Sequence, residues 1–440
     1  MNNLLHADLI LEARWIIPVE PANTQLEHHS VVIKKGRIID LLPTHTARTR
    51  YSASDTRELN DHVLIPGLIN AHTHAAMSLM RGIADDMPLM SWLQDAIWPL
   101  EQKLVSSEFV YDGSTLAAAE MLSGGVTTCC DMYFYPDAAA RAFTDAGMRA
   151  VLGMTIIDFP GNYATDADDY LTKGLAARDH WKEHPLLSFV LAPHAPYTVS
   201  NSTFERIATL AEELDAGIHI HIHETHQEIS QSLAQYGMRP LQRLQNLGLV
   251  GPALHATHAV HMTDTELELL ADCNVSISHN PTSNMKLASG IAPVHAMLAR
   301  KINVALGSDG AASNNRLDIF QEMRLAALLA KVSSLDASSL SAHQALRMAT
   351  INGARALGIH EKTGSIEIGK LADLCAVQIN TPLVQPCYDI TSHLVYVMGR
   401  ESVTDVWVGG ESRVNKGNLL HVSNNELLRL SCLWQNAMKR

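Results

Sequence analysis

The sequence predicts an α/β fold, in which a (β/α)8 barrel of the TIM type carries a small β-sandwich built from both ends of the chain. Eight short apolar segments of the kind found in buried strands occur between residues 63 and 307, and helical stretches separate most of them. Both chain ends contain short runs rich in β-branched residues. The length of 440 residues suits a barrel of roughly 250 residues with an added domain.

The two ends of the chain share this strand-rich character. Short β-branched runs occur between residues 9 and 40, where Lys35 and Gly36 are typical of a hairpin turn, and they recur between residues 371 and 414. The chain is therefore expected to divide into an N-terminal part of the sandwich, the barrel, and a C-terminal part of the sandwich with a tail, at residues 1–62, 63–368 and 369–440.

The middle of the chain alternates between two patterns. Residues 202–215 and 263–271 have the period of an amphipathic helix, and Thr263 with Asp264 before a Glu-rich turn is typical of a helix N-cap. Eight buried strands that alternate with helices favour a closed parallel barrel over an open sheet. The expected strands are residues 63–69, 126–130, 150–154, 187–191, 217–222, 253–257, 275–278 and 304–307.

The composition argues against several classes of protein. The formal net charge is −13 and no run of Lys and Arg occurs, so a nucleic acid polymer is not expected as a partner. The six cysteines form no Cys-x-x-Cys pair, which argues against a zinc knuckle or a disulfide scaffold. The first residues lack the features of a signal peptide, and no apolar stretch of about 18 residues is present to span a membrane. We expect a cytoplasmic protein.

Metal-binding and acidic side chains follow the predicted barrel strands, at the point where each strand ends. In a parallel barrel the carboxyl ends of all strands meet at one mouth, so residues far apart in the sequence converge there. The residues are His72 and His74 at the first strand, His194 at the fourth, His221, His223 and Glu224 at the fifth, His258 at the sixth, His279 at the seventh and Asp309 at the eighth.

The first pair of histidines has the spacing of metal ligands on a strand. Side chains alternate along a strand, so His72 and His74 lie on the same side. With a third histidine from the fifth strand and one carboxylate, they offer ligands for one divalent metal, Zn²⁺ in the first place and Fe²⁺ as the alternative. An open coordination position would hold water, whose pKa falls from about 15.7 to about 7 on such a metal. His219 and His223 share a face with His221 at different depths, so we expect structural or supporting roles for them.

The acidic residues at the same mouth suit a hydrolysis that removes an amino group from a ring. The ring nitrogen beside the attacked carbon must gain a proton, and so must the leaving amine. Glu224 is the candidate to carry both protons, as a glutamate that is not a ligand does in zinc deaminases in general. Asp309 is suited to ligate the metal and to take a proton from the water, and His258 to hydrogen-bond that water. The roles of His223 and His279 are left open.

Several motifs around these residues point to a known family. Pro-Gly-Leu-Ile-Asn-Ala-His-Thr-His and Ser-Asn-Met-Lys-Leu-Ala-Ser-Gly are two of them, and the motifs together lie at residues 66–74, 221–225, 278–290, 307–315 and 363–374. At these places the sequence resembles the amidohydrolase superfamily. Within it, the sequence resembles the 5-methylthioadenosine/S-adenosylhomocysteine deaminases and the related triazine hydrolases. The first and last motifs are typical of the whole superfamily, whereas the run from Ser283 to Gly290 is more specific to this branch.

This resemblance implies an activity and a set of site residues. The implied activity is the metal-dependent hydrolytic deamination of an adenine nucleoside (5′-methylthioadenosine, adenosine or S-adenosylhomocysteine) to the inosine analogue and ammonia. A homo-oligomer is also implied. The implied metal ligands are His72, His74, His221 and Asp309. The implied substrate contacts are Glu101 at the ribose hydroxyls, His194 near the purine or ribose, Trp92 as an apolar wall, and Glu224 as the proton shuttle, with His258 assisting the water.

The sequence departs from this family in one place. Some members carry an arginine after the third barrel strand, where it meets the amino-acid carboxylate of S-adenosylhomocysteine. Residues 158–170 of this chain contain acidic residues and no arginine. Because a buried carboxylate without a partner is costly, we expect methylthioadenosine or adenosine to be handled better than S-adenosylhomocysteine.

Two other interpretations remain open. A triazine, guanine or pterin aminohydrolase would share the same metal chemistry, since fold-level similarity does not settle the substrate. Glu101 discriminates between these, because it matters for a ribonucleoside and less for a bare ring. The second alternative is a non-catalytic assembly protein that keeps the barrel, and the complete set of ligand-type residues with Glu224 argues against it.

Overall fold

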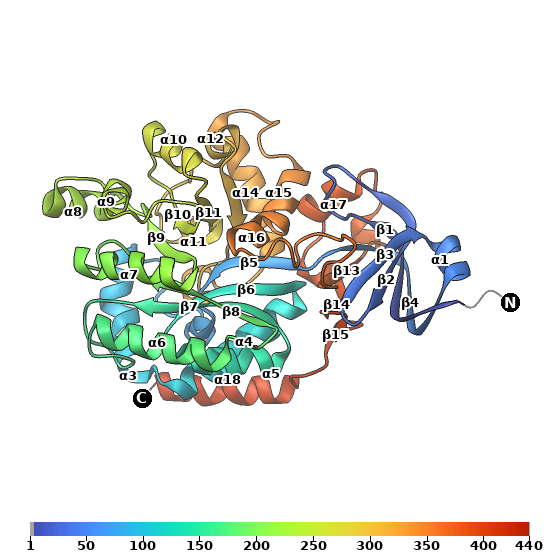
Figure 1. Cartoon of the computed structure of the whole chain (residues 1–440), viewed down its shortest axis with the longest axis horizontal. Helices are drawn as coiled ribbons and strands as arrows, with labels where there is room; N and C mark the ends of the chain where they lie inside the picture. Colours follow the sequence, from blue (N-terminus) through green and yellow to red (C-terminus); the bar gives the residue numbers. More distant parts are fainter. Residues whose placement is uncertain (1–3, 440) are drawn as a thin grey trace.

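The computed structural model describes residues 4–439, and its architecture confirms the predicted fold class. Eight parallel strands form a barrel, which lies beside a second sheet made from both chain ends (Figure 1). Each segment expected to be a barrel strand overlaps one, although residues 63–66 of the first segment lie in a strand of the second sheet. In chain order these strands are β5 (Leu68–Thr73), β6 (Val126–Tyr133), β7 (Arg149–Ile156), β8 (Leu187–Pro193), β9 (Ile218–Ile222), β10 (Leu254–His258), β11 (Ser276–His279) and β12 (Asn303–Leu306).

Helices on the outside of the barrel connect the strands. α7 (Asn201–Leu214) and α10 (Asp264–Asp272) lie where the sequence predicts helices. Thr263 caps α10, because its side chain accepts from the Glu266 amide at 3.3 Å and the Glu266 carboxylate accepts from the Thr263 amide at 2.9 Å. Other connecting helices are α4 (Ser107–Ser123), α5 (Pro136–Ala146), α6 (Ala167–Trp181), α8 (His226–Tyr236), α9 (Pro240–Asn246), α11 (Pro281–Lys286), α12 (Val294–Ala299), α14 (Ile319–Ser334), α15 (Ala342–Met348) and α16 (Ile351–Ala356).

The barrel closes at a seam between β12 and β5, the two ends of the hydrogen-bonded strand order. Asn70 bridges the seam, because its side chain accepts from the Ser308 amide at 2.9 Å and donates to Ser308 Oγ at 2.7 Å. Further along, the Asp309 amide donates to the His72 carbonyl at 3.0 Å, and Thr73 Oγ1 donates to the Asp309 carbonyl at 3.0 Å. Polar groups therefore complete the ring at the end where the ligand-type residues gather.

Both chain ends contribute to the second sheet, which is mixed and has eight strands. β1 (Leu5–Ile16) runs antiparallel to β2 and parallel to β4. Lys35 and Gly36 have φ values of 49° and 73° and form the predicted two-residue turn between β2 and β3. The other strands are β2 (Leu26–Lys34), β3 (Arg37–Pro43), β4 (Tyr51–Pro66), β13 (Leu374–Gln378), β14 (Val403–Val408), β15 (Glu411–Asn415) and β16 (Asn418–Leu419).

The second sheet and the barrel are continuous through β4. This strand pairs with β13 as far as Pro66, which lies opposite Leu374, and only Gly67 separates it from β5. A Cβ atom on Gly67 would lie 2.1 Å from Oγ1 of Thr127, so the tight passage between the two sheets requires glycine. The predicted division of the chain at residue 62 falls inside β4.

The C-terminal helix α18 (Asn424–Met438) leaves the second sheet and lies along the barrel beside α4 (Figure 1). Trp434 packs edge-to-face on Phe109, with ring centroids 5.1 Å apart. The Trp434 indole Nε1 also donates to Asp112 at 2.8 Å. The chain end is thereby attached to the barrel and not to the sheet that precedes it.

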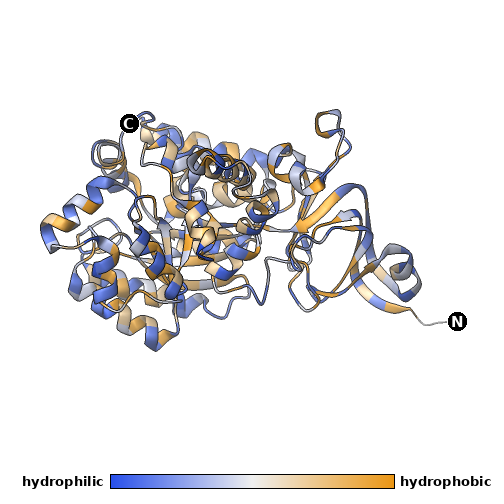
Figure 2. Cartoon of the chain, turned by 90° about the horizontal axis from the view of Figure 1, so that it is seen from above, coloured by the Kyte–Doolittle hydropathy of each residue, from blue (hydrophilic) through white to orange (hydrophobic). Residues whose placement is uncertain are grey.

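Hydrophobic residues gather where barrel strands meet helices, and the outward faces of the peripheral helices are hydrophilic (Figure 2). The second sheet has a smaller core of its own, to which Leu11, Ile33 and Trp407 contribute. No helix in the described residues is long and apolar enough to cross a membrane.

A buried ion pair joins the bottom of the barrel to the second sheet. Arg149, at the start of β7, donates to both carboxylate oxygens of Asp373, at 2.9 Å from Nε and 3.2 Å from a terminal nitrogen. Asp373 also accepts from the Gly409 amide at 2.6 Å, and Arg149 donates to the Pro185 carbonyl at 3.0 Å. Both side chains are buried, so each depends on the other for a charged partner.

We expect Arg149→Ala to lower the free energy of unfolding by about 3–5 kcal/mol, because it leaves the Asp373 carboxylate buried and unpaired. Arg57→Ala is the matched control, since Arg57 pairs with Asp55 at 2.8 Å on the surface, and exposed pairs contribute about 1 kcal/mol or less. Urea denaturation followed by circular dichroism measures both. Equal losses in the two variants would contradict the assigned role of the buried pair.

Candidate metal centre

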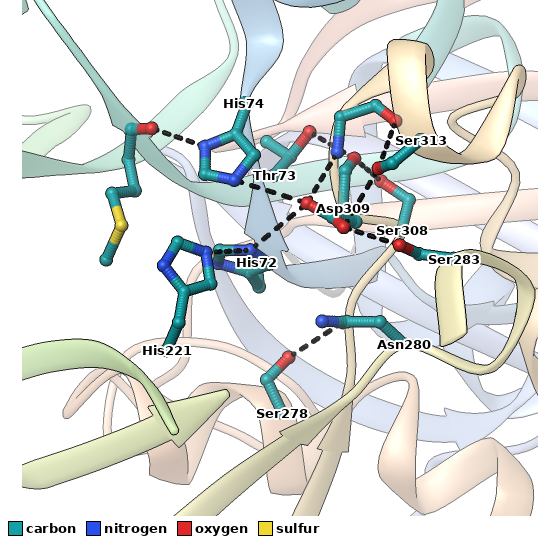
Figure 3. A network of polar contacts seen from close by, with 12 residues as sticks. His72, Thr73, His74, His221, Ser278, Asn280, Ser283, Ser308, Asp309 and Ser313 are labelled. Carbon is teal, nitrogen blue, oxygen red and sulfur yellow. Dashed lines mark hydrogen bonds and ion pairs between the residues drawn. The ribbon is translucent and has the colours of Figure 1, made fainter. Parts of the chain in front are cut away.

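Three histidines and one aspartate meet at the mouth of the barrel (Figure 3). Nε2 of His72 and Nε2 of His74 lie 3.4 Å and 3.2 Å from Oδ1 of Asp309. Nε2 of His221 lies 3.2 Å from Nε2 of His72. β5, β9 and the loop after β12 supply these residues, as the positions of the predicted strands require. The structure thus brings together all four side chains that the sequence analysis named as ligands.

Hydrogen bonds to main-chain carbonyls hold the outer nitrogens of two of these imidazoles, so that their inner nitrogens are free to bind a metal. Nδ1 of His74 lies 2.5 Å from the Met132 carbonyl, and Nδ1 of His221 lies 2.7 Å from the His194 carbonyl. Because a carbonyl only accepts, both nitrogens must carry the proton. In the neutral form of each ring Nε2 then carries the lone pair, and this atom lies beside Asp309 in His74 and beside Nε2 of His72 in His221. Imidazole nitrogens of this kind with one carboxylate fit a divalent metal.

The charges at the cluster support the same assignment. Burial would raise the pKa of Asp309, but hydrogen bonds and ion pairing with His72 and His74 hold it well below its usual range. Burial lowers the pKa of His72 to about 4. Burial also opposes protonation of His74, but the Asp309 carboxylate outweighs it and raises the pKa of His74 to about 9. The Asp309 carboxylate thus attracts positive charge, whether a proton on His74 or a cation bound by the neutral ring.

Local backbone geometry aims the carboxylate. Asp309 has a φ of 60°, an uncommon left-handed conformation for a residue other than glycine. Its Oδ1 accepts from the Gly310 amide at 2.9 Å, and its Oδ2 accepts from Ser283 Oγ at 2.6 Å and Ser313 Oγ at 2.9 Å (Figure 3). His258 at the end of β10 has a φ of 72°. Strained conformations of this kind persist where the surroundings hold them in place.

A second carboxyl group, Glu224, lies just after β9 and is buried beside the cluster. Its Oε1 accepts from Ser289 Oγ at 3.1 Å, and its Oε2 lies 3.6 Å from Nε2 of His258. Burial raises the pKa of Glu224, because the charged form loses its hydration. A carboxyl whose pKa is raised toward neutral pH is suited to accept and release a proton.

Glu228 holds the turn that carries Glu224, and sequence analysis missed it. The two Glu228 carboxylate oxygens accept from the backbone amides of His223 and Glu224, each at 2.9 Å. Thr225 caps α8, and Glu228 stands three residues later, which is the spacing of a capping box. That spacing was visible in the sequence, but it predicts a bond to the cap residue and not to the two residues before it.

A cavity of about 480 Å³ opens above the cluster. Eight of the nine predicted site residues line it, and the ninth, His72, is fully buried beneath. Glu101 comes from α3 (Trp98–Leu104) and Trp92 from the preceding π-helix η2 (Trp92–Ile97). His194 follows β8, and its Nδ1 lies 3.2 Å from Thr198 Oγ1.

Glu101 is held by a tyrosine that sequence analysis did not single out. Tyr133 at the end of β6 donates from its hydroxyl to Glu101 Oε1 at 2.6 Å. Burial raises the pKa of Glu101 to about 7, although the tyrosine hydrogen bond acts in the opposite direction. The second oxygen and the remaining lone pairs of this carboxyl stay available to a bound molecule.

Aromatic side chains line part of the cavity, and the segments after β6 and β7 supply several of them. Phe134, Tyr163 and Tyr170 pack together, with the Tyr163 and Tyr170 ring centroids 5.7 Å apart. Asn162 ties this segment to the end of α3 by donating to the Gln102 carbonyl at 2.8 Å. Among the residues that the structure describes, no lysine or arginine lines the cavity.

The two histidines whose roles the sequence left open lie outside the ligand cluster. His223 Nε2 accepts from the Leu241 amide at 3.1 Å, and His223 Nδ1 lies 3.7 Å from Glu266, so this ring connects the segments around α9 and α10. His279 is buried at the end of β11, and burial lowers its pKa to about 3.

The chain is similar to several known proteins over nearly its whole length. Residues 63–413 match the model of the amidohydrolase family. The chain is 46% identical to a 5-methylthioadenosine/S-adenosylhomocysteine deaminase of Saccharophagus degradans, over 99% of this chain and 98% of the other. It is 40% identical to a 5′-deoxyadenosine deaminase of Methanosarcina mazei, over 92% of each chain. The crystal structure of an adenosine deaminase from Xanthomonas campestris with bound zinc superposes with a TM-score of 0.98, at 45% identity, over 99% of this chain and 100% of that one.

Proposed function

This chain belongs to the amidohydrolase family, and we propose that it is a metal-dependent aminohydrolase that converts an adenine nucleoside to the inosine analogue and ammonia. The observation that carries the proposal is the buried Glu224 beside three imidazoles and the Asp309 carboxylate, at the bottom of a cavity that has Glu101 in its wall. Similarity over nearly the full chain to deaminases of adenine nucleosides supports this substrate class.

The metal in this proposal is a zinc ion held by His72, His74, His221 and Asp309. Three neutral imidazole nitrogens and a carboxylate oxygen suit zinc, and the similar protein from Xanthomonas campestris contains it. When bound, the metal would act as a Lewis acid that makes water a nucleophile near neutral pH.

The side chains of the chain itself would move the protons. Addition of water to C6 of the adenine ring releases two protons, of which one ends on ring N1 and the other leaves with the amine as ammonia. Glu224 is the group to carry them, because its carboxyl lies beside His258 at the cavity and burial raises its pKa. His258 Nδ1 lies 2.8 Å from Oδ1 of Asn284, so it donates there and leaves Nε2 free as an acceptor beside Glu224.

The walls of the cavity would bind the nucleoside. The ionised Glu101 carboxylate would accept hydrogen bonds from the two ribose hydroxyls while Tyr133 holds it in place. His194 would contact the base or the ribose, and Trp92 would pack against the sugar or its 5′ substituent. The aromatic side chains after β7 would then face an apolar 5′ substituent.

The test of the proposed function is ammonia release from 5′-methylthioadenosine by the zinc-loaded protein, with adenosine, S-adenosylhomocysteine, guanine and a triazine run in parallel. We expect turnover of the adenine nucleosides, its loss with a chelator, and a fall in kcat of about 10²–10⁴-fold in Glu224→Gln. If only guanine or the triazine were turned over, the proposed substrate class would be wrong, but the assignment as a hydrolase would stand. If the zinc-bound protein released ammonia from none of these compounds, the proposed aminohydrolase activity would be contradicted.

Glu101 makes substrate binding depend on pH. Its pKa is raised to about 7 by burial, so below that pH the carboxyl is protonated and loses an acceptor for the diol. We expect kcat/KM for adenosine to fall as pH drops below about 7, by up to roughly tenfold per pH unit. Glu101→Gln should lower kcat/KM by about 10–100-fold and abolish this pH limb. 2′,3′-Dideoxyadenosine, which lacks the diol, is the control and should not respond to Glu101. An unchanged pH profile in Glu101→Gln would contradict this role.

Because no lysine or arginine lines the described cavity, we expect substrates with an uncharged 5′ substituent to be preferred. Methylthioadenosine should have a kcat/KM about 10–100-fold above that of S-adenosylhomocysteine, because the amino-acid carboxylate would be desolvated without a partner. A neutral 5′-butylthioadenosine separates charge from length and should behave like methylthioadenosine. Comparable values for the two natural thio-nucleosides would refute the prediction.

A further inference from the structure

The three ligand imidazoles differ in what holds their outer nitrogens. His74 and His221 donate from Nδ1 to main-chain carbonyls. Nδ1 of His72 instead lies 2.8 Å from Nε2 of His219, which is buried inside the barrel two residues before His221. Among the described residues, His219 is therefore the only side chain that hydrogen-bonds the outer nitrogen of one of these three rings. Because the partner is a side chain, a substitution at residue 219 removes this hydrogen bond.

The protons on this pair follow from the geometry. Nε2 of His72 faces Asp309 and must keep its lone pair to bind a metal, so Nδ1 of His72 carries the proton. Nε2 of His219 is then the acceptor, and the proton of the His219 ring lies on Nδ1. That Nδ1 is 3.2 Å from the His255 carbonyl, to which it donates. A chain of two hydrogen bonds thus runs from β5 across the barrel interior to β9 and β10.

We propose that His219 is a positioning residue of the metal centre, whose Nε2 accepts the His72 proton and so sets the tautomer and the orientation of that ligand. An apolar side chain in place of His219 would leave the buried His72 N–H without its partner. The proposal rests on the metal site of the proposed function and does not depend on the substrate. Partners of this kind raise metal affinity about 10–100-fold in other metal sites.

A competing interpretation of the same side chains is a second metal site. One ligand atom each from Cys130, His219 and His255 lies within 4.8 Å of the others. Both nitrogens of His219 are already engaged, however. Burial also raises the pKa of the Cys130 thiol, so the thiolate that a metal requires is disfavoured. We therefore assign His219 to the first site alone.

The experiment measures zinc affinity of the purified apoprotein by competition with a chromophoric chelator, together with zinc content per chain. We expect His219→Phe to bind zinc about 10–100-fold more weakly than the unsubstituted protein. His219→Gln should lose less, because its amide oxygen is able to accept from His72. His255→Phe is the matched control: it removes an equally buried imidazole, packed on His219 with ring centroids 4.4 Å apart, and keeps the accepting carbonyl.

Each result decides the question. Zinc binding in His219→Phe as tight as in the unsubstituted protein overturns the proposal, as does an equal loss in His255→Phe. Two zinc ions per chain, with one lost in Cys130→Ala, would establish the second site instead. Circular dichroism of the apoproteins checks folding, and His219→Leu replaces the phenylalanine variant if the larger ring does not fit. Because no substrate is involved, failure of the deaminase assay would leave this test intact.

Discussion

The buried charge of Asp309 is the constraint on which the barrel mouth depends. A carboxylate removed from water costs several kcal/mol unless opposite charge and hydrogen bonds compensate. The Asp309 carboxylate lies beside two histidines at the end of β5. It also accepts hydrogen bonds from two serine hydroxyls and from the amide of the next residue. The same residue closes the seam of the barrel through its backbone. The side chain of Asp309 thus supplies the negative charge of the site, and its backbone closes the barrel.

Supporting contacts extend this arrangement outward. Glu228 fixes the turn that presents Glu224, and Tyr133 fixes Glu101. Asn162 reaches from the segment after β7 to the end of α3, the helix that carries Glu101. The group proposed to hold the ribose and the wall proposed to face the 5′ substituent are therefore coupled. A substitution of Asn162 would therefore be expected to disturb both.

Much of this was predictable because strand patterns are local. Eight apolar runs were enough to place His72, His221 and Asp309 at one mouth, since parallel strands end on the same side. Alternation places His219, His221 and His223 on one face of the fifth strand, and their different depths along it separated His221 from the other two. Alternation states which side of a strand a residue faces, but not its partner across the barrel. The pairs His72 with His219 and Tyr133 with Glu101 are set by that packing, so sequence analysis gave His219 only a general supporting role and did not find Tyr133.

The single residue Gly67 between β4 and β5 has a consequence for how this protein is divided. One strand belongs to the second sheet, the next contains the proposed ligand His72 and ends just before His74, and no linker lies between the two strands. The two parts are therefore not modules that recombination could exchange, because any junction near residue 62 would cut a paired strand. A chimaera would have to take the second sheet and the first barrel strand from the same parent. The proposed metal site and a sheet that supplies none of its proposed residues would therefore be exchanged together.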